Sequence, residues 1–313
     1  MGHVNVVPEM RIYIYSFHMP LFFYISGYLF KEDKYPKLTG FVSAKAKSLL
    51  VPYFWFSVLS IILVYFRVIF HYVSKIPSIE SLLSQFFYLN GSALWNVPLW
   101  FLVCLFVTSI EYYLLRKSIK NDYLLIGYLI AISVLGFQAA SYLPFRLPFG
   151  IDISLSAVVF YGAGNIIRKR GISIKNAPLK VAIFVLLFAG SIFAGLQSPE
   201  RVDMYYLKYG NYLNFYIAAF LGIGAYTMLS QFIPKAPILS YFGKNSLIIL
   251  STQYIIFWLM DAFLLLTLKT SFYSLPPSTP RGLLISLGEI LLSIPLIFII
   301  NKYIPFILGR QRT

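Results

Sequence analysis

The sequence has 313 residues, of which 59% are hydrophobic and 12% are charged, and its formal net charge is +15 at pH 7. Soluble domains carry about 25% charged residues, so this composition excludes an ordinary soluble domain and indicates a membrane protein. Lysines and arginines are spread over short segments between apolar runs, so the positive charge does not predict a nucleic-acid partner. The single cysteine, Cys104, excludes a disulfide framework and a cysteine-based metal site.

Apolar runs of about 18 to 25 residues recur along the chain, which is the length that a helix needs to cross hydrocarbon. They lack the alternation of β-barrel strands. We therefore predict an all-α fold, a polytopic transmembrane helix bundle forming one domain over residues 1–313. The nine predicted spans cover residues 12–30, 50–72, 97–115, 123–143, 150–167, 179–197, 212–232, 246–268 and 282–304.

The segments between the spans alternate in charge. By the positive-inside rule, the segments rich in lysine and arginine face the cytoplasm, together with the C-terminus, and the poorer segments face outward. The basic residues concerned are Lys31, Lys34, Lys37, Lys45, Lys47, Arg116, Lys117, Lys120, Arg168, Lys169, Arg170, Lys175, Lys180, Lys235, Lys244, Arg310 and Arg312. An inside C-terminus after nine spans leaves residues 1–11 outside, so we expect a tenth helix that Met1 interrupts near its outer end.

Histidine suits proton transfer and transient acylation near neutral pH, and the chain has three histidines. His18 lies about two turns inside the first predicted span, where an ionisable side chain is costly to bury and is often functional. An interhelical hydrogen bond that only packs the bundle is the alternative. His71 lies among Tyr and Phe at the end of a span, which favours an interfacial position.

Several other polar residues have two possible roles each, one in substrate binding and one in structure. Glu9 and Arg11 could hold a hydroxylated acceptor or remain solvated. Ser26 could line a cavity or pack between helices, and packing is favoured. Asp152 could cap a helix or contact the acceptor. Within the apolar runs, charged side chains should face the bundle interior rather than lipid; these are Arg67, Asp261 and Glu289.

The stretch FHMPLFFYISGYLFK, residues 17–31, resembles the signature second helix of the acyltransferase-3 family of integral membrane acyltransferases, especially the branch similar to fucose 4-O-acetylase. In that family the first helix ends in a Gly-His pair, and Gly2 and His3 stand in its place. Further family-like stretches are LLVPYFWF, PLWFLVCLF, LPFGIDISLSAVVFYGAGNII and FGKNSLIILSTQYIIF. The last of these has Gln253 where the family often has a histidine.

The resemblance implies ten helices, of which the first is largely missing here. It also implies an O-acyltransferase that moves an acyl group, expected to be acetyl, from cytoplasmic acetyl-CoA to a hydroxyl of a cell-envelope or exported saccharide or lipid-linked glycan. His3 and His18 would be catalytic, and Glu9, Arg11, Ser26 and Asp152 would bind substrate. No metal is expected.

Residues 31–50 place Leu38, Phe41 and Val42 among lysines, as an interfacial helix does. These lysines could attract anionic membrane lipids or the phosphates of coenzyme A. Two other functions stay open. A transporter or flippase of a lipid-linked or small hydroxylated molecule would also have buried charges and an aromatic lining, and an inactive truncated remnant is the third reading.

Overall fold

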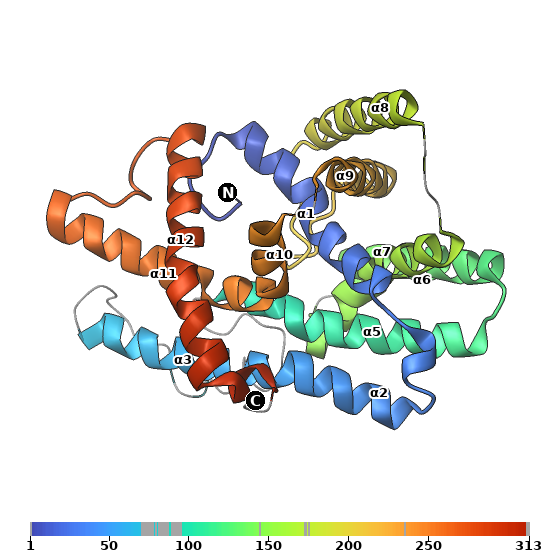
Figure 1. Cartoon of the computed structure of the whole chain (residues 1–313), viewed down its shortest axis with the longest axis horizontal. Coiled ribbons are helices and arrows are strands. Elements are labelled where there is room, and N and C mark those ends of the chain that lie inside the picture. The colour runs from blue at the N-terminus through green and yellow to red at the C-terminus, as the bar shows by residue number, and fades with distance from the viewer. Residues whose placement is uncertain are drawn as a thin grey trace.

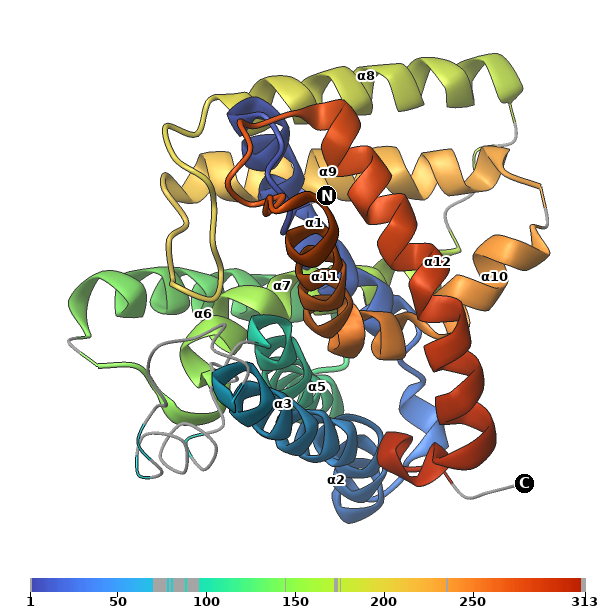
Figure 2. The same ribbon diagram turned by 90° about the vertical axis from the view of Figure 1, so that its left-hand side faces the viewer.

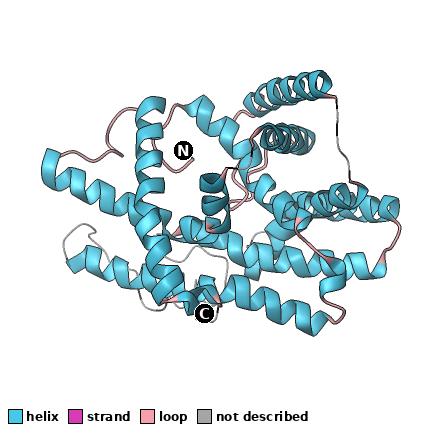
Figure 3. Cartoon of the chain, viewed as in Figure 1, coloured by secondary structure: helices cyan, strands magenta, loops and turns pink. Residues whose placement is uncertain are grey.

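The structure is a computed structural model that describes residues 2–69, 96–143, 145–171, 176–234 and 236–310, with residues 78, 80, 88 and 174 between them. Within these residues the chain forms helices and no strand, with an isolated β-bridge between Asp203 and Lys208 (Figure 3). The predicted all-α class is confirmed. The main helices are α1 (Pro8–Tyr28), α2 (Leu38–Lys45), α3 (Val51–Ile69), α5 (Trp100–Ser118), α6 (Asp122–Tyr142), α7 (Ile151–Arg170), α8 (Ala177–Leu196), α9 (Tyr212–Phe232), α10 (Pro237–Lys244), α11 (Ser246–Leu268) and α12 (Thr279–Tyr303).

Eight helices of the described chain are long and apolar enough to cross a membrane, and they overlap eight of the nine predicted spans; the largest offset is at Leu38–Tyr65, predicted as 50–72. The protein is therefore a multi-pass membrane protein. The remaining predicted span, residues 12–30, corresponds to α1. This helix does not reach that apolarity, and it carries Arg11, Ser16 and His18. Instead, α1 packs against α7, α8 and α9 (Figure 1), and this protein environment accommodates its polar groups.

The predicted interfacial helix is continuous with the following span. A π-helical turn, Ala46–Leu50, joins α2 to α3 without a break, and the two helices follow one another in Figure 1. Phe41 of α2 is buried and stacks on Tyr113 of α5, with ring centroids 4.6 Å apart. The basic segment is thereby fixed against the helix bundle.

Small residues let α1 approach its neighbours closely. A Cβ atom at Gly27 would overlap the backbone carbonyl of Tyr161 in α7, and one at Gly164 would overlap the carbonyl of Tyr24. Glycine at such contacts brings two helix backbones together and allows dense packing, as is common in membrane bundles. The α1–α7 contact therefore fixes α1, which carries His18.

One end of the bundle is held by an ionic cluster around Glu32, which follows α1. Its carboxylate accepts hydrogen bonds from Arg116 at 3.3 Å, Lys120 at 2.6 Å and Lys169 at 3.0 Å. Arg116 also binds Asp122 at 2.6 Å. We name these five residues the Glu32 cluster. They join the end of α1 to the ends of α5 and α7 and the start of α6, at the side predicted to face the cytoplasm.

Glu32 is only 14% exposed, and burial by itself opposes ionisation. The hydrogen bonds and charges of Lys120 and Lys169 outweigh this effect and lower the pKa of Glu32 to about 2. The carboxylate thus stays charged throughout the physiological range.

At the other end, the segment before α1 is tied to the loop before α12. The Ser278 amide donates to the carbonyl of Asn5 at 3.0 Å, and the Asn5 side chain donates to the Leu275 carbonyl at 2.7 Å. Val4 and Val6 are buried, with Gly282 of α12 beside them. These contacts hold the segment that carries His3 beside α11 and α12 (Figure 2).

Two of the charged residues predicted inside apolar runs can be placed. Asp261 accepts hydrogen bonds from the Ser271 hydroxyl at 2.7 Å and the Phe272 amide at 2.9 Å, so it holds the loop after α11. Glu289 is buried on the inner face of α12. The side chains of Arg67 and His71 lie outside the described part of the chain.

Candidate functional site

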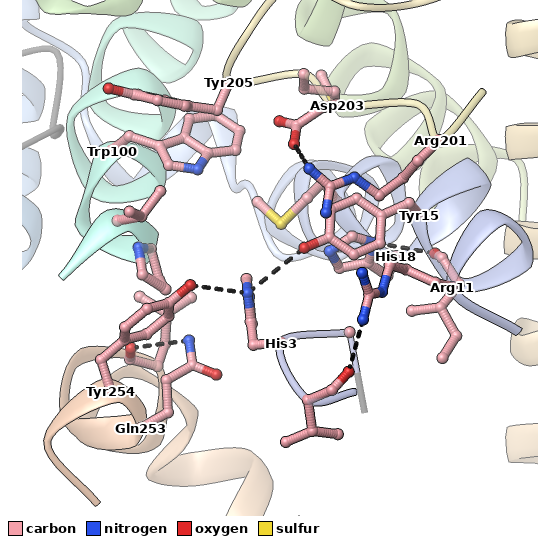
Figure 4. Close-up of a pocket in the computed structure, with 18 of the residues that line it drawn as sticks. His3, Arg11, Tyr15, His18, Trp100, Arg201, Asp203, Tyr205, Gln253 and Tyr254 are labelled. Atoms are coloured by element: carbon pink, nitrogen blue, oxygen red, sulfur yellow. Dashed lines mark hydrogen bonds and ion pairs between the residues drawn. The ribbon is translucent and has the colours of Figure 1, made fainter. Parts of the chain in front are cut away.

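A cavity of about 650 Å³ opens between the segment before α1, α1 itself, the start of α5, the loop between α8 and α9, and α11 (Figure 4). It combines a few polar groups with flat aromatic faces, which is the usual form of a small-molecule site. The polar and aromatic side chains that line it include His3, Asn5, Arg11, Tyr15, His18, Trp100, Arg201, Asp203, Tyr205, Tyr206, Gln253 and Tyr254.

His3 lies between two tyrosines in the cavity (Figure 4). Its Nδ1 atom is 3.1 Å from the Tyr254 hydroxyl and 3.4 Å from the Tyr15 hydroxyl. When a phenol donates to Nδ1, the neutral imidazole carries its proton on Nε2. Burial is the largest influence on this group, and nearby positive charges, including Arg201 and Arg11, act in the same direction; together they lower the pKa of His3 to about 3. His3 is therefore neutral at physiological pH.

His18 has a tautomer that its hydrogen bond fixes. Its Nδ1 lies 2.9 Å from the Ile14 carbonyl in the preceding turn of α1. A carbonyl can only accept, so Nδ1 carries the proton and Nε2 keeps a free lone pair. The Tyr15 ring packs edge-on against the His18 ring at 4.7 Å between centroids. A neutral imidazole with a fixed tautomer and an acceptor nitrogen in a cavity is a suitable general base.

The loop between α8 and α9 forms one wall of the cavity. Asp203 and Lys208 exchange backbone hydrogen bonds of 2.7 and 2.9 Å, which close the loop into a tight turn. From this turn Arg201 reaches over the Tyr15 ring, 4.4 Å from its centroid, and pairs with Asp203 at 2.6 Å. Burial raises the pKa of Asp203, while the Arg201 charge opposes that rise. The pair orders the wall on the side of Tyr15.

Asp152 supports the same loop from behind, at Tyr205. It binds Arg146 at 2.5 Å, and the Arg146 guanidinium donates to the Tyr205 carbonyl at 2.6 Å. Gly150, with φ 66°, is the N-cap residue of α7, so the predicted capping role of Asp152 is wrong. Asp152 acts through Arg146 on Tyr205, which lines the cavity.

The structure brings together three of the six predicted site residues. His3, His18 and Arg11 line the cavity. The other three lie outside its lining: Glu9 is exposed, Ser26 donates to the Phe22 carbonyl of its own helix at 2.8 Å, and Asp152 is buried behind the wall. The catalytic roles of the two histidines stay predictions.

Sequence reasoning missed most of the remaining wall. Tyr254 directly follows Gln253, the position at which the family often has a histidine, and Tyr15 lies one turn before His18, so proximity in sequence could have suggested both. Gln253 itself lines the cavity and donates to the Leu250 carbonyl at 3.2 Å. No local signal marks Arg201 or Tyr205, because their loop is distant in sequence from the histidines.

A second cavity, of about 440 Å³, lies beside the first turn of α11. Lys244 and Asn245 contribute to its wall, while Ser246, the next residue, lines the first cavity. Lys47 and Arg310 add two further cations, and no acidic residue is among its described lining. This arrangement suits a ligand that carries phosphate groups. No group of three or more metal-ligand side chains is found in the described residues.

Comparison with known proteins identifies the family. No curated protein and no solved structure was found to match the chain. The sequence model of the acyltransferase-3 family, described as an acyltransferase domain, matches residues 2–302. The resemblance seen in the motifs thus extends over almost the whole chain. The protein belongs to the acyltransferase-3 family and is a multi-pass membrane enzyme that transfers acyl groups.

Proposed function

We propose that the protein is an O-acyltransferase of the cytoplasmic membrane, with its C-terminus in the cytoplasm, that moves acetyl from acetyl-CoA to a hydroxyl of a cell-envelope or exported saccharide. The observation that carries this proposal is that His3 and His18 line one cavity, with the tautomer of His18 set by its hydrogen bond to a carbonyl. The motif resemblance to the fucose 4-O-acetylase branch supports acetyl as the acyl group and a sugar as the acceptor.

In the proposed reaction, Nε2 of His18 accepts the proton of the sugar hydroxyl. The hydroxyl oxygen attacks the carbonyl carbon of the thioester, so a C–O bond forms and the carbonyl oxygen becomes an oxyanion. The C–S bond then breaks, and the leaving thiolate takes the proton from His18. General-base catalysis of this kind contributes roughly 10²- to 10⁴-fold to the rate.

His3 and its tyrosine partners have a separate role. The Tyr254 and Tyr15 hydroxyls meet at His3 Nδ1, and His3 offers its Nε2–H as a donor. Donors fixed in advance in a site of low polarity stabilise an oxyanion without reorganising at the moment of reaction. Because its lowered pKa makes His3 a weak base, it supplies this hydrogen bond without taking a proton from the acceptor.

The second cavity is the proposed entrance for the donor. Its cations Lys47, Lys244 and Arg310 would bind the phosphates of coenzyme A. The turn of α11 that begins at Ser246 separates it from the histidine cavity, so a thioester reaching past this turn would approach His18. Donor and acceptor would thus enter from opposite ends of the bundle.

The test measures transfer of labelled acetyl from acetyl-CoA to glycan in membranes that contain the full chain. We expect label in the glycan with the parent protein and a roughly 10²- to 10⁴-fold lower rate with His18→Ala. Thr267→Ala is the matched control, because this exposed residue of α11 donates to the Phe263 carbonyl of its own helix and lies outside the cavity lining. It should keep the parent rate.

Equal transfer by the parent and His18→Ala would contradict the role of His18. No transfer by a well-inserted parent protein, combined with protein-dependent movement of the intact glycan across the membrane, would instead establish a transporter or flippase.

A further inference from the structure

The histidine cavity carries an unbalanced positive charge. Among its described lining residues the permanent cations are Arg11 and Arg201, and the only carboxylate is Asp203. Asp203 is paired with Arg201 at 2.6 Å. Arg11 lies in the first turn of α1, at the cavity wall. It has no carboxylate partner in the described part of the chain.

The hydrogen bonds of Arg11 fix its position but do not neutralise its charge. One terminal nitrogen, Nη2, donates to the Val4 carbonyl at 3.2 Å and approaches the Asn5 side-chain oxygen at 3.5 Å. Its Nε atom is buried without a hydrogen-bond partner in the described structure. The Arg11 charge is thus held at the cavity wall without a carboxylate partner in the described chain, which favours an anionic group that arrives with the ligand.

The remaining wall is aromatic. Trp100 and Tyr205 lie with ring centroids 6.1 Å apart, on the side of the cavity opposite Arg11 and Arg201 (Figure 4). Tyr254 and Tyr206 extend this surface. Aromatic rings combine broad apolar faces with polar hydroxyl tips, which suits a ring that has both C–H faces and hydroxyl edges.

We infer that the acceptor is an acidic saccharide, whose carboxylate or phosphate pairs with Arg11 while its sugar ring covers Trp100 and Tyr205. This inference rests on the proposed function and narrows its substrate class. A guanidinium presents paired donors in a plane that matches a carboxylate or a phosphate, whereas a neutral sugar would leave the Arg11 charge uncompensated in the cavity.

The first experiment measures binding without turnover, so its result does not depend on acetyl transfer. Three trisaccharides that differ in one group are titrated against the purified full chain: a hexuronate, the neutral sugar obtained by reducing its carboxyl group, and a hexose phosphate. Quenching of tryptophan fluorescence reports occupation beside Trp100. We expect at least one anionic sugar to bind about tenfold more tightly than the neutral one, which corresponds to about 1.4 kcal/mol.

Variants then assign that preference to a residue. Arg11→Gln should abolish the preference for the anionic sugar, and Arg11→Lys should retain part of it, because lysine keeps the charge but loses the planar pair of donors. Lys208→Gln is the matched control: it removes a positive charge from the loop between α8 and α9, but this exposed side chain lies outside the cavity lining, so the variant should change the preference much less. The unfolding temperature of each variant shows whether it folds.

Equal affinity of the parent for all three sugars would overturn the inference, as would a preference that persists in folded Arg11→Gln. A loss of acetyl-CoA affinity in Arg11→Gln, with sugar selectivity unchanged, would assign Arg11 to the donor and also overturn it. Failure of the proposed function gives a different result, since selective sugar binding without acetyl transfer would leave the Arg11 site in place.

Discussion

The charged groups at the two ends of α1 differ in whether they are paired: those of the Glu32 cluster are paired, and Arg11 in the cavity has no carboxylate partner in the described chain. In the Glu32 cluster every cation found near the carboxylate is engaged by it, and Arg116 has a second carboxylate in Asp122. Towards the other end of α1, the cavity holds an imidazole, His18, with a free lone pair, and a guanidinium, Arg11, without a carboxylate partner in the described chain. The paired charges of the Glu32 cluster join helices, whereas the cavity has polar groups that remain available to bind a ligand and to react.

The largest expected effect separates these two roles in one crossed experiment. His18→Ala should lower the acetyl-transfer rate roughly 10²- to 10⁴-fold with little change in unfolding temperature, because its only described protein hydrogen bond is within its own helix. Glu32→Gln should keep the transfer rate per folded molecule. Transfer rates and melting curves are measured on the same preparations. If each variant lost both its transfer rate and its stability, the separation of a catalytic His18 from a structural Glu32 would be refuted.

The next effect concerns stability at the Glu32 cluster. Glu32→Gln leaves Arg116, Lys120 and Lys169 close together without their shared carboxylate, so we expect a loss of about 2 kcal/mol and a melting temperature lower by about 3 °C. Lys120→Gln is the matched control, because its side chain is 65% exposed. It should cost less than about 1 kcal/mol. Equal losses of unfolding free energy in the two variants would show that the stability of the cluster does not depend mainly on the Glu32 carboxylate.

A smaller effect is expected behind the cavity wall. Asp152→Asn removes the charge that holds Arg146, and Arg146 in turn holds the Tyr205 carbonyl. Tyr205 should then lose its fixed position, which raises the KM for the acceptor about tenfold while kcat changes little. Steady-state kinetics at varied acceptor concentration measures this split. A fall in kcat alone would place Asp152 closer to the chemistry than the structure does.

The smallest effect appears only at acid pH. The pKa of His3 is about 3 in the folded protein, below its ordinary 6.5, so the unfolded chain binds the proton first and stability falls as pH drops from 6.5 towards 3. The pKa of Glu32 is about 2, below its ordinary 4.5, so its contribution is complete above 4.5 and is lost as pH falls towards 2.

The two ends therefore occupy different pH windows. His3→Gln should flatten the stability profile between pH 6.5 and 4.5, and Glu32→Gln should flatten it only below pH 4.5. Melting temperatures measured from about pH 7 to about pH 2 would test this order. A profile of the parent that His3→Gln leaves unchanged would contradict the low pKa of His3.

Sequence alone determined the class of the molecule. Apolar runs of helical length are local features, and eight of the nine predicted spans recur as helices that meet the length and apolarity of a membrane span. The motif around His18 is also local, and the family it indicated matches residues 2–302. The continuation of α2 into α3 was not predicted from the sequence. Lysines among apolar residues are typical of a separate interfacial helix, and this pattern does not show whether the backbone continues as a helix.

Only the tertiary structure decided which polar groups meet. His3 and Tyr254 are 251 positions apart and share a hydrogen bond, and Arg201 covers Tyr15 from a loop between two other helices. Its position at the start of a predicted span made Asp152 a candidate for substrate contact, but its burial against Arg146 depends on how a loop folds back. Hydrophobic periodicity specifies helices one at a time, whereas a site depends on how those helices pack, and the close contact at Gly27 and Gly164 sets that packing for α1.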